Sequence, residues 1–280
     1  MSIKTVNGVD LFYEELGSGP PLILHHGYTG AHDVWLDQIA PRLADRYRCI
    51  VMDARGAGDS AHPEGGYTIE QYALDVVGMA DALGLDRFTY VGHSMGGGIG
   101  MQLGIEHADR LDKLVLVAPI PSGGTQADPE AHAKAVEVRQ ATDAREQMLR
   151  QRLLLRVRDV PDERVAQAVD RALSVSEAHF EDSWTTMAEF NVTDRLDELT
   201  TPTLIVAGAA DGLCAANIQD FLRLPNASLH VFSRVGHGVP GDVPEQFSEV
   251  LADFFEHGVI NARTQQEKLQ AAQTEAVASR

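Results

Sequence analysis

Short apolar runs alternate with amphipathic stretches through residues 1–120 and again through residues 200–258. Near the start, strands are predicted at 3–6 and 9–15, joined by a turn at Asn7-Gly8, because both turn residues tolerate a positive φ. Further strands are predicted at 21–25, 48–52, 87–91, 113–118, 203–207 and 229–232. Helices are predicted at 34–44, 69–83, 215–224 and 244–255. This alternation is typical of a largely parallel α/β sheet with helices on both faces.

The pattern changes between residues 121 and 199, where charged helical stretches replace the strands. Four helices are expected there, near 129–142, 144–157, 162–174 and 176–190. Open α/β sheets bind ligands at the carboxyl ends of their strands, and a helical insert after a strand is placed to cover that edge. We therefore expect a core of residues 1–120 and 200–258, with residues 121–199 as a helical lid. The polar tail, residues 259–280, fits either a frayed helix or a disordered segment.

A serine lies at a predicted strand-to-helix junction. Residues 92–96, Gly-His-Ser-Met-Gly, match G-x-S-x-G, with a β-rich run before them and a helix after them. Such a turn holds the serine in a strained conformation with its hydroxyl exposed, and the helix that begins there favours developing negative charge. The context predicts that Ser94 is a nucleophile.

A serine hydroxyl needs a neighbouring base to become a good nucleophile. His237 follows a predicted strand in Val-Gly-His-Gly-Val, where flanking glycines allow its loop to reach the turn at Ser94. Asp211 follows strand 203–207 directly and is predicted to orient the imidazole and stabilise its charged form. Asp128, in the predicted lid, is a weaker alternative for this acid. The order Ser, Asp, His is that of α/β-hydrolases.

The oxyanion of an acyl-transfer reaction needs two preorganised N–H donors. The first is expected from Met95, directly after the nucleophile, and the second from Tyr28 in the loop after strand 21–25. His26 in the same loop is expected to order it rather than to bind a metal. His93 is expected to pack and hydrogen-bond beside the nucleophile rather than to react.

The motifs HGYTG, DARGAGDS, GHSMGG, AGAADG and VGHG together resemble the α/β-hydrolase superfamily, in its lidded esterase and lactonase branch. The resemblance covers nearly the whole chain except the lid and the tail. It implies an α/β-hydrolase fold, a Ser94–Asp211–His237 triad and oxyanion amides from Tyr28 and Met95. It also implies a structural role for the loop 53–60. The dehalogenases and epoxide hydrolases of this superfamily carry Asp at the nucleophile position, so Ser94 excludes both activities.

Composition narrows the range of partners and cofactors. The net charge of −18 disfavours nucleic acid and anionic membranes, which such a surface repels. No metal-ligand spacing occurs, and residues 236–241 match a dinucleotide fingerprint only formally, because too little chain follows. We expect no metal and no organic cofactor.

Two unpaired cysteines and the lack of a signal peptide favour a cytoplasmic protein, and a homo-oligomer is compatible with the sequence.

The predicted function is hydrolysis of a carboxylic ester or lactone through an acyl-enzyme on Ser94. Three alternatives remain: a C–C bond hydrolase of a ring-cleavage product, a cofactor-free perhydrolase, and a small-molecule receptor that keeps its triad. The lid also contains a cluster of arginines, which are expected to pair with nearby acids on a solvated face. A second interpretation has one of them binding a substrate carboxylate.

Overall fold

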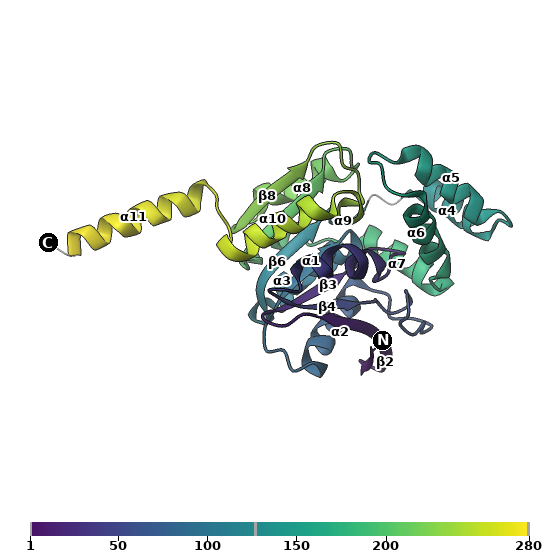
Figure 1. The fold of residues 1–280 in the computed structure, drawn as a ribbon, viewed down its shortest axis with the longest axis horizontal. Coiled ribbons are helices and arrows are strands. Elements are labelled where there is room, and N and C mark those ends of the chain that lie inside the picture. The colour runs from purple at the N-terminus through teal and green to yellow at the C-terminus, as the bar shows by residue number, and fades with distance from the viewer. Residues whose placement is uncertain (1, 126–127, 279–280) are drawn as a thin grey trace.

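A computed structural model describes residues 2–125 and 128–278, and in this part of the chain the strands form one eight-stranded sheet (Figure 1). The strand order is β1-β2-β4-β3-β5-β6-β7-β8. The strands are β1 (Ser2–Val6), β2 (Val9–Leu16), β3 (Pro21–His25), β4 (Arg48–Met52), β5 (Phe88–His93), β6 (Leu111–Val117), β7 (Thr203–Gly208) and β8 (Ala227–Phe232). Strands β3 to β8 run parallel, whereas β2 is antiparallel to β1 and β4. This arrangement confirms the predicted α/β-hydrolase fold.

The hairpin at the start of the chain forms as its turn residues predict. Val6 pairs with Val9, and the two residues between them have φ values of 50° at Asn7 and 77° at Gly8. Positive φ at both central positions matches the turn to the right-handed twist of the strands.

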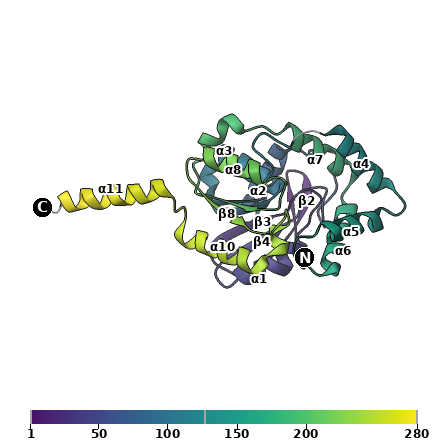
Figure 2. The same cartoon turned by 90° about the horizontal axis from the view of Figure 1, so that it is seen from above.

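Helices cover both faces of the sheet (Figures 1 and 2). One face carries α1 (Ala40–Leu43), α9 (Val239–Asp242) and α10 (Pro244–His257), and the other carries α2 (Ile69–Ala82), α3 (Met95–Glu106) and α8 (Cys214–Arg223). Neighbouring strand residues alternate between the two faces, so Ile50 and Tyr90 belong to one buried cluster, and Val51 and Val91 to the other. Burial of both faces explains why these strands are continuous apolar runs in the sequence.

The helix predicted at 34–44 divides into two pieces. A π-helical turn spans Trp35–Ile39, and α1 follows it. Pro41 lacks an N–H group and its ring crowds the carbonyl four residues earlier, so a continuous α-helix is disfavoured here. The Ala40 amide donates instead to the carbonyl of Trp35, five residues back.

Among the described residues between β6 and β7 there are four α-helices, which form the teal and green part of Figure 1 beside the sheet. They are α4 (Pro129–Gln140), α5 (Ala144–Leu155), α6 (Asp162–Ser174) and α7 (Glu177–Glu189), each within two residues of its predicted bounds. Short 3₁₀ segments at Ala108–Arg110 and Thr193–Glu198 were not predicted.

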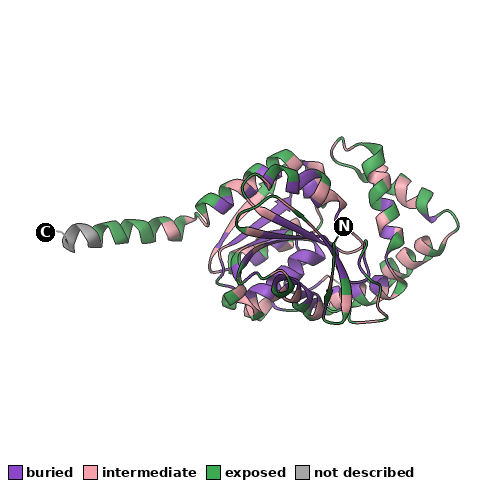
Figure 3. Ribbon diagram, turned by 60° about the horizontal axis from the view of Figure 1, so that its bottom comes forward, coloured by how far each residue is buried: buried purple, intermediate pink, exposed green. Residues whose placement is uncertain are grey.

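The polar tail forms a helix, which was one of its two predicted states. This helix, α11 (Ala262–Ala278), projects away from the rest of the molecule (Figures 1 and 3). Figure 3 shows that its described surface is largely exposed. Within residues 2–125 and 128–278, no helix has the length and apolar content needed to cross a bilayer. Both cysteines are free, and Cys49 is buried.

A polar contact joins α7 to α2 inside the fold. His179 is 0% exposed, and its Nδ1 lies 2.9 Å from the hydroxyl of Tyr72 and 3.2 Å from the carbonyl of Arg55. Burial lowers the pKa of His179 to about 3. The folded protein therefore keeps this imidazole neutral at pH values where an unfolded chain protonates it.

Replacing His179 with Gln is expected to weaken the dependence of stability on pH. Below pH 6.5 unfolding takes up one proton at His179, so the wild-type protein loses stability as the pH falls towards 3. The free energy of unfolding should fall about 1.4 kcal/mol more per pH unit in wild type than in the variant. Urea unfolding between pH 6 and 4.5 measures both slopes, and equal slopes would contradict the assignment.

Candidate active site

Ser94 lies on a sharp turn between β5 and α3 with a φ of 58°, in the left-handed region that non-glycine residues rarely adopt. Its amide donates to the carbonyl of Val117 over 2.9 Å, which holds the strained turn against the neighbouring strand β6. The turn also explains the first glycine of the motif. A Cβ at Gly92 would lie 2.1 Å from the carbonyl oxygen of Gly96, so no larger residue fits.

The three predicted triad residues come together at the carboxyl ends of β5, β7 and β8. The Nε2 atom of His237 lies 2.9 Å from Ser94 Oγ, and its Nδ1 lies 2.8 Å from Asp211 Oδ2. In the tautomer that serves general-base chemistry, the Ser94 hydroxyl donates to Nε2, and Nδ1–H donates to the carboxylate. Ser94 and His237 are 143 positions apart in the sequence, and Asp211 and His237 are 26 positions apart. The sheet topology brings all three residues together.

Asp211 is held in its charged form. Burial alone raises the pKa of this carboxyl, but the hydrogen bond and charge of His237 and the amide of Leu213 outweigh burial, and the pKa is lowered overall. The side chain of Asp211 is 6% exposed, whereas that of His237 is 42% exposed and open to the site. The alternative acid, Asp128, is elsewhere: its carboxylate accepts the amides of Glu130 and Ala131 and caps α4.

Two backbone amides near Ser94 are unoccupied donors. In the described chain, neither Tyr28 N–H nor Met95 N–H has a hydrogen-bond acceptor. Gly27, beside Tyr28, packs so closely on the nucleophile that a Cβ there would lie 2.8 Å from Ser94 Cβ. The loop after β3 and the start of α3 therefore each bring an N–H group without an internal acceptor next to the nucleophile turn, and an oxyanion hole needs two such donors.

The loop that carries Tyr28 is held by neutral histidines. His26 Nε2 accepts the amide of Ala54 over 3.0 Å, so the ring proton is on Nδ1, which donates to the carbonyl of Gly27 over 2.8 Å. His25 Nδ1 donates to the carbonyl of His26, and burial lowers the pKa of His25 to about 3. The structure therefore gives His26 the ordering role that was predicted for it.

His93 connects the nucleophile turn to the histidine loop. Its Nε2 donates to the carbonyl of His237 over 2.8 Å, and the two rings lie 4.9 Å apart between centroids. Burial lowers the pKa of His93 to about 3, so the ring is neutral and carries only one donor proton. The predicted packing and hydrogen-bonding role of His93 agrees with these contacts.

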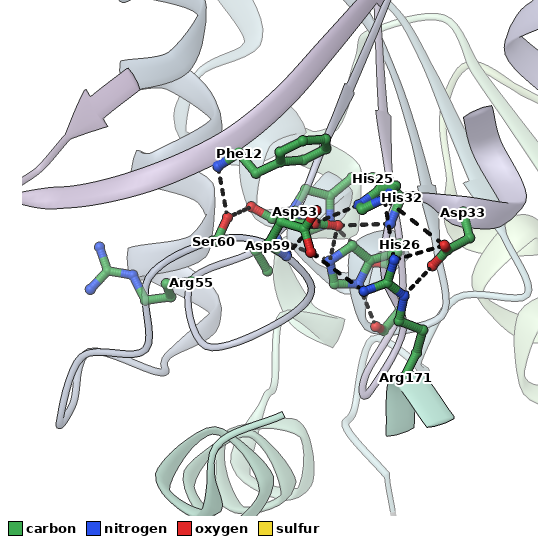
Figure 4. Close-up of polar contacts among 12 residues, drawn as sticks. Phe12, His25, His26, His32, Asp33, Asp53, Arg55, Asp59, Ser60 and Arg171 are labelled. Carbon is green, nitrogen blue, oxygen red and sulfur yellow. Dashed lines mark hydrogen bonds and ion pairs between the residues drawn. The ribbon is translucent and has the colours of Figure 1, made fainter. Parts of the chain in front are cut away.

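A polar network beside the site was not predicted from the sequence (Figure 4). Fully buried Asp53, at the end of β4, accepts both the backbone N–H and the Nδ1–H of His32, each over 2.7 Å. Next to His32, Asp33 is paired with Arg171 of α6 at 2.7 and 2.9 Å. Burial opposes a charge on His32, but the hydrogen bond to Asp53 raises its pKa. The contact between Asp33 and Arg171 joins segments 138 positions apart, so no local pattern could have indicated it.

A cavity of about 680 Å³ opens onto Ser94 and His237. One side is formed by the loop after β3 and the histidine loop. The other side is formed by α5, α6 and the segment between them, including Arg152, Leu155 and Val165. No group of three or more His, Cys, Asp or Glu side chains in residues 2–125 and 128–278 is arranged to hold a metal ion.

Comparison with known proteins identifies the relatives of this chain. Residues 20–242 match the family described as alpha/beta hydrolase fold. RutD of Caulobacter sp. strain K31, whose name assigns it provisionally to carbamate hydrolysis, is 30% identical over 276 residues, covering 88% of this chain and 96% of that protein. A non-heme chloroperoxidase of Streptomyces lividans is 28% identical and covers 90% of this chain and 98% of its own.

Solved structures are also similar to this chain over most of its length. Est816, described as an N-acyl homoserine lactone degrading enzyme, is 30% identical with a TM-score of 0.78, and the match covers 90% of this chain and all of that one. The esterase EaEST of Exiguobacterium antarcticum is 25% identical with a TM-score of 0.82, covering 91% and 99% of the two chains. These relatives differ in named activity but share one fold and most of their length with this protein. The chain therefore belongs to the α/β-hydrolase family.

Proposed function

We propose that this protein is a serine hydrolase that cleaves a carboxylic ester or lactone through an acyl-enzyme on Ser94. The observation that carries the proposal is the continuous contact from Ser94 Oγ to His237 Nε2 at 2.9 Å and from His237 Nδ1 to Asp211 at 2.8 Å. Relatives named as an esterase and a lactone-degrading enzyme support the same bond type. No cofactor is needed for this chemistry.

In the acylation step, Ser94 Oγ attacks the carbonyl carbon and its proton passes to His237 Nε2. The negative charge moves to the carbonyl oxygen, where the amides of Tyr28 and Met95 stabilise it; one such donor contributes about 3 kcal/mol to the transition state. As the tetrahedral intermediate collapses, His237 returns the proton to the leaving alkoxide. In a lactone this alkoxide stays tethered to the acyl group.

Deacylation repeats the sequence with water as the nucleophile. His237 takes a proton from water, the hydroxide attacks the acyl carbon, and Ser94 leaves with the proton from His237. Asp211 stays ionised throughout and stabilises the imidazolium that forms twice per turnover. Its lowered pKa is consistent with this role.

Turnover of a panel of aryl esters, alkyl esters and lactones tests the proposal. We expect hydrolysis of simple esters or lactones with release of free acid, and none in a triad variant. Binding of these compounds without turnover would instead favour a receptor. Turnover of only a vinylogous 1,5-diketone, with no ester hydrolysis, would favour the C–C bond hydrolase.

A second candidate activity is perhydrolysis, which the similarity to a non-heme chloroperoxidase favours. The same acyl-enzyme is then attacked by hydrogen peroxide instead of water, and the product is a peracid. Adding hydrogen peroxide during ester turnover and measuring peracid against free acid separates the two activities. We expect free acid to dominate.

Residues 121–199 are proposed to form a lid over this site. Helices α5 and α6 supply one side of the cavity, and two of the contacts that attach the segment to the core involve residues that line this cavity. The Arg171 guanidinium pairs with Asp33, and the Tyr28 hydroxyl donates to the carbonyl of Phe180 over 2.6 Å. The second contact places α7 directly against the loop that presents the Tyr28 amide.

Shortening an apolar lid residue is expected to change substrate ranking more than catalysis. Leu155 lines the cavity and is 68% exposed, so a bound acyl chain covers it. Leu155→Ala should lower kcat/KM for an octanoate ester by about fivefold, from loss of about 1 kcal/mol of apolar contact, and leave an acetate ester nearly unchanged. Leu154→Ala is the matched control, because Leu154 is 81% exposed and lies outside the cavity lining. Equal losses on both esters would contradict the lid assignment.

A further inference from the structure

The arginines of α4 to α6 divide into two groups by their contacts. Four of them are held by partners on neighbouring segments. These are Arg139, which donates to the carbonyls of Ala172 and Val175, Arg145 with Asp170, Arg156 with Asp162, and Arg171 with Asp33. Arg152 on α5 differs from these, because its side chain has no hydrogen bond or ion pair to any residue in the described part of the chain.

Arg152 lines the same cavity as Ser94 and His237. The residue is exposed overall, yet the protein atoms around its guanidinium lower its pKa, and no acid opposes the effect. An arginine stays protonated at any ordinary pH, so a positive charge faces the cavity without a counter-ion. A partly desolvated charge of this kind is stabilised by an anion that enters the cavity.

The other charged groups of the cavity do not neutralise Arg152. Arg164, on α6, also lines the cavity, and its side chain has no partner among the described residues. The carboxyl of Asp242 is half-buried, which raises its pKa, and it already accepts the amide of Gly236. Asp37 is an exposed residue of the π-helical turn that lines the cavity from the core side. Arg152 and Arg164 therefore bring two positive charges without an ion-pair partner among the described residues to the side of the cavity that α5 and α6 form.

We infer that Arg152 binds a carboxylate carried by the substrate, at a distance from the bond that Ser94 cleaves. The inference rests on the proposed ester or lactone hydrolysis and specifies its substrate class as an anionic ester or lactone. A guanidinium presents parallel N–H donors that match the two oxygens of a carboxylate, which makes arginine the suitable residue for this recognition. Arg164 supplies a second positive charge to the same side of the cavity.

A pair of matched esters tests the assignment. The 4-nitrophenyl ester of glutaric acid carries a free carboxylate, and the ester of glutaramic acid replaces it with a neutral amide of the same size. We expect wild-type enzyme to prefer the anionic ester by about tenfold in kcat/KM, and Arg152→Gln to remove that preference while changing the neutral ester less than about twofold. Succinate and adipate esters repeat the comparison at other chain lengths.

Arg150→Gln is the control variant, because Arg150 is exposed on the same helix two positions away and does not line the cavity. It should keep the preference for the anionic ester. Raising the salt concentration should also increase KM for the anionic ester alone, since an open cavity is screened by ions. Absence of the preference in wild type at all three chain lengths, or an equal loss on both esters in Arg152→Gln, overturns the inference.

Binding of glutarate, measured by calorimetry, separates this inference from the proposed function. We expect wild type to bind glutarate about tenfold more tightly than Arg152→Gln does. Equal or undetectable binding overturns the carboxylate site. If glutarate binds through Arg152 but no ester or lactone is turned over, the carboxylate site stands and the proposed hydrolysis is wrong.

Discussion

Replacing Ser94 with Ala is expected to lower ester turnover by about six orders of magnitude, to a rate near that of the oxyanion donors and binding alone. The substitution removes the only atom that forms the acyl-enzyme, and neither His237 nor Asp211 can compensate for it. A fluorophosphonate should label wild-type protein once, at Ser94, and should leave the variant unlabelled. Mass spectrometry of the labelled peptide, with steady-state rates, measures both outcomes.

Ser18→Ala is a suitable control, because Ser18 is exposed in the loop between β2 and β3. It should keep full activity and full labelling at Ser94. Labelling of another serine, or full turnover in Ser94→Ala, would show that the nucleophile lies elsewhere.

Replacing Asp211 with Asn is expected to lower kcat by about four orders of magnitude with little change in KM, as in a chymotrypsin-type triad. The amide keeps the size of the carboxyl but removes the charge that stabilises the imidazolium. Its NH₂ group also donates to Nδ1, which moves the ring proton to Nε2, where it faces Ser94. The imidazole then cannot accept the serine proton. Rates measured above and below pH 7, with circular dichroism to check the fold, test this result.

Asp128→Asn provides the matched comparison, since Asp128 was the alternative acid. Its carboxylate caps α4, and asparagine is an equally good N-cap, so both stability and turnover should be unchanged. Near-normal turnover in Asp211→Asn together with a large loss in Asp128→Asn would reverse the assignment.

The sheet and its helices could be predicted because each element repeats a simple pattern. Strand residues such as Ile50 and Val51 point to opposite faces, and both faces are covered, so β4 appears in the sequence as an unbroken apolar run. Residues that tolerate a positive φ also indicated the position of a turn, as Asn7-Gly8 does. The helix at 34–44 was predicted less well. The spacing of its apolar residues fits a continuous helix, but Pro41 has no N–H group to donate a helical hydrogen bond.

The residues of the proposed triad were readable from the sequence because each follows a strand of a parallel sheet, and the carboxyl ends of such strands meet at one edge. The sequence by itself therefore determined the fold class, the positions of Ser94, Asp211 and His237, and the loop that carries Tyr28. It did not determine the contacts that support this site. The hydrogen bond from His32 to Asp53 and the ion pair between Arg171 and Asp33 each join side chains from separate elements. These contacts form only when the fold brings those elements together.

The tertiary structure alone decided which arginines of α4 to α6 have partners. In the sequence they form one charged cluster without distinction. The fold places acids or carbonyl groups beside four of them and directs Arg152 towards the cavity without a counter-ion. Ion pairing depends on distances of a few ångströms between helices, and helical periodicity specifies only which face of its own helix a residue occupies.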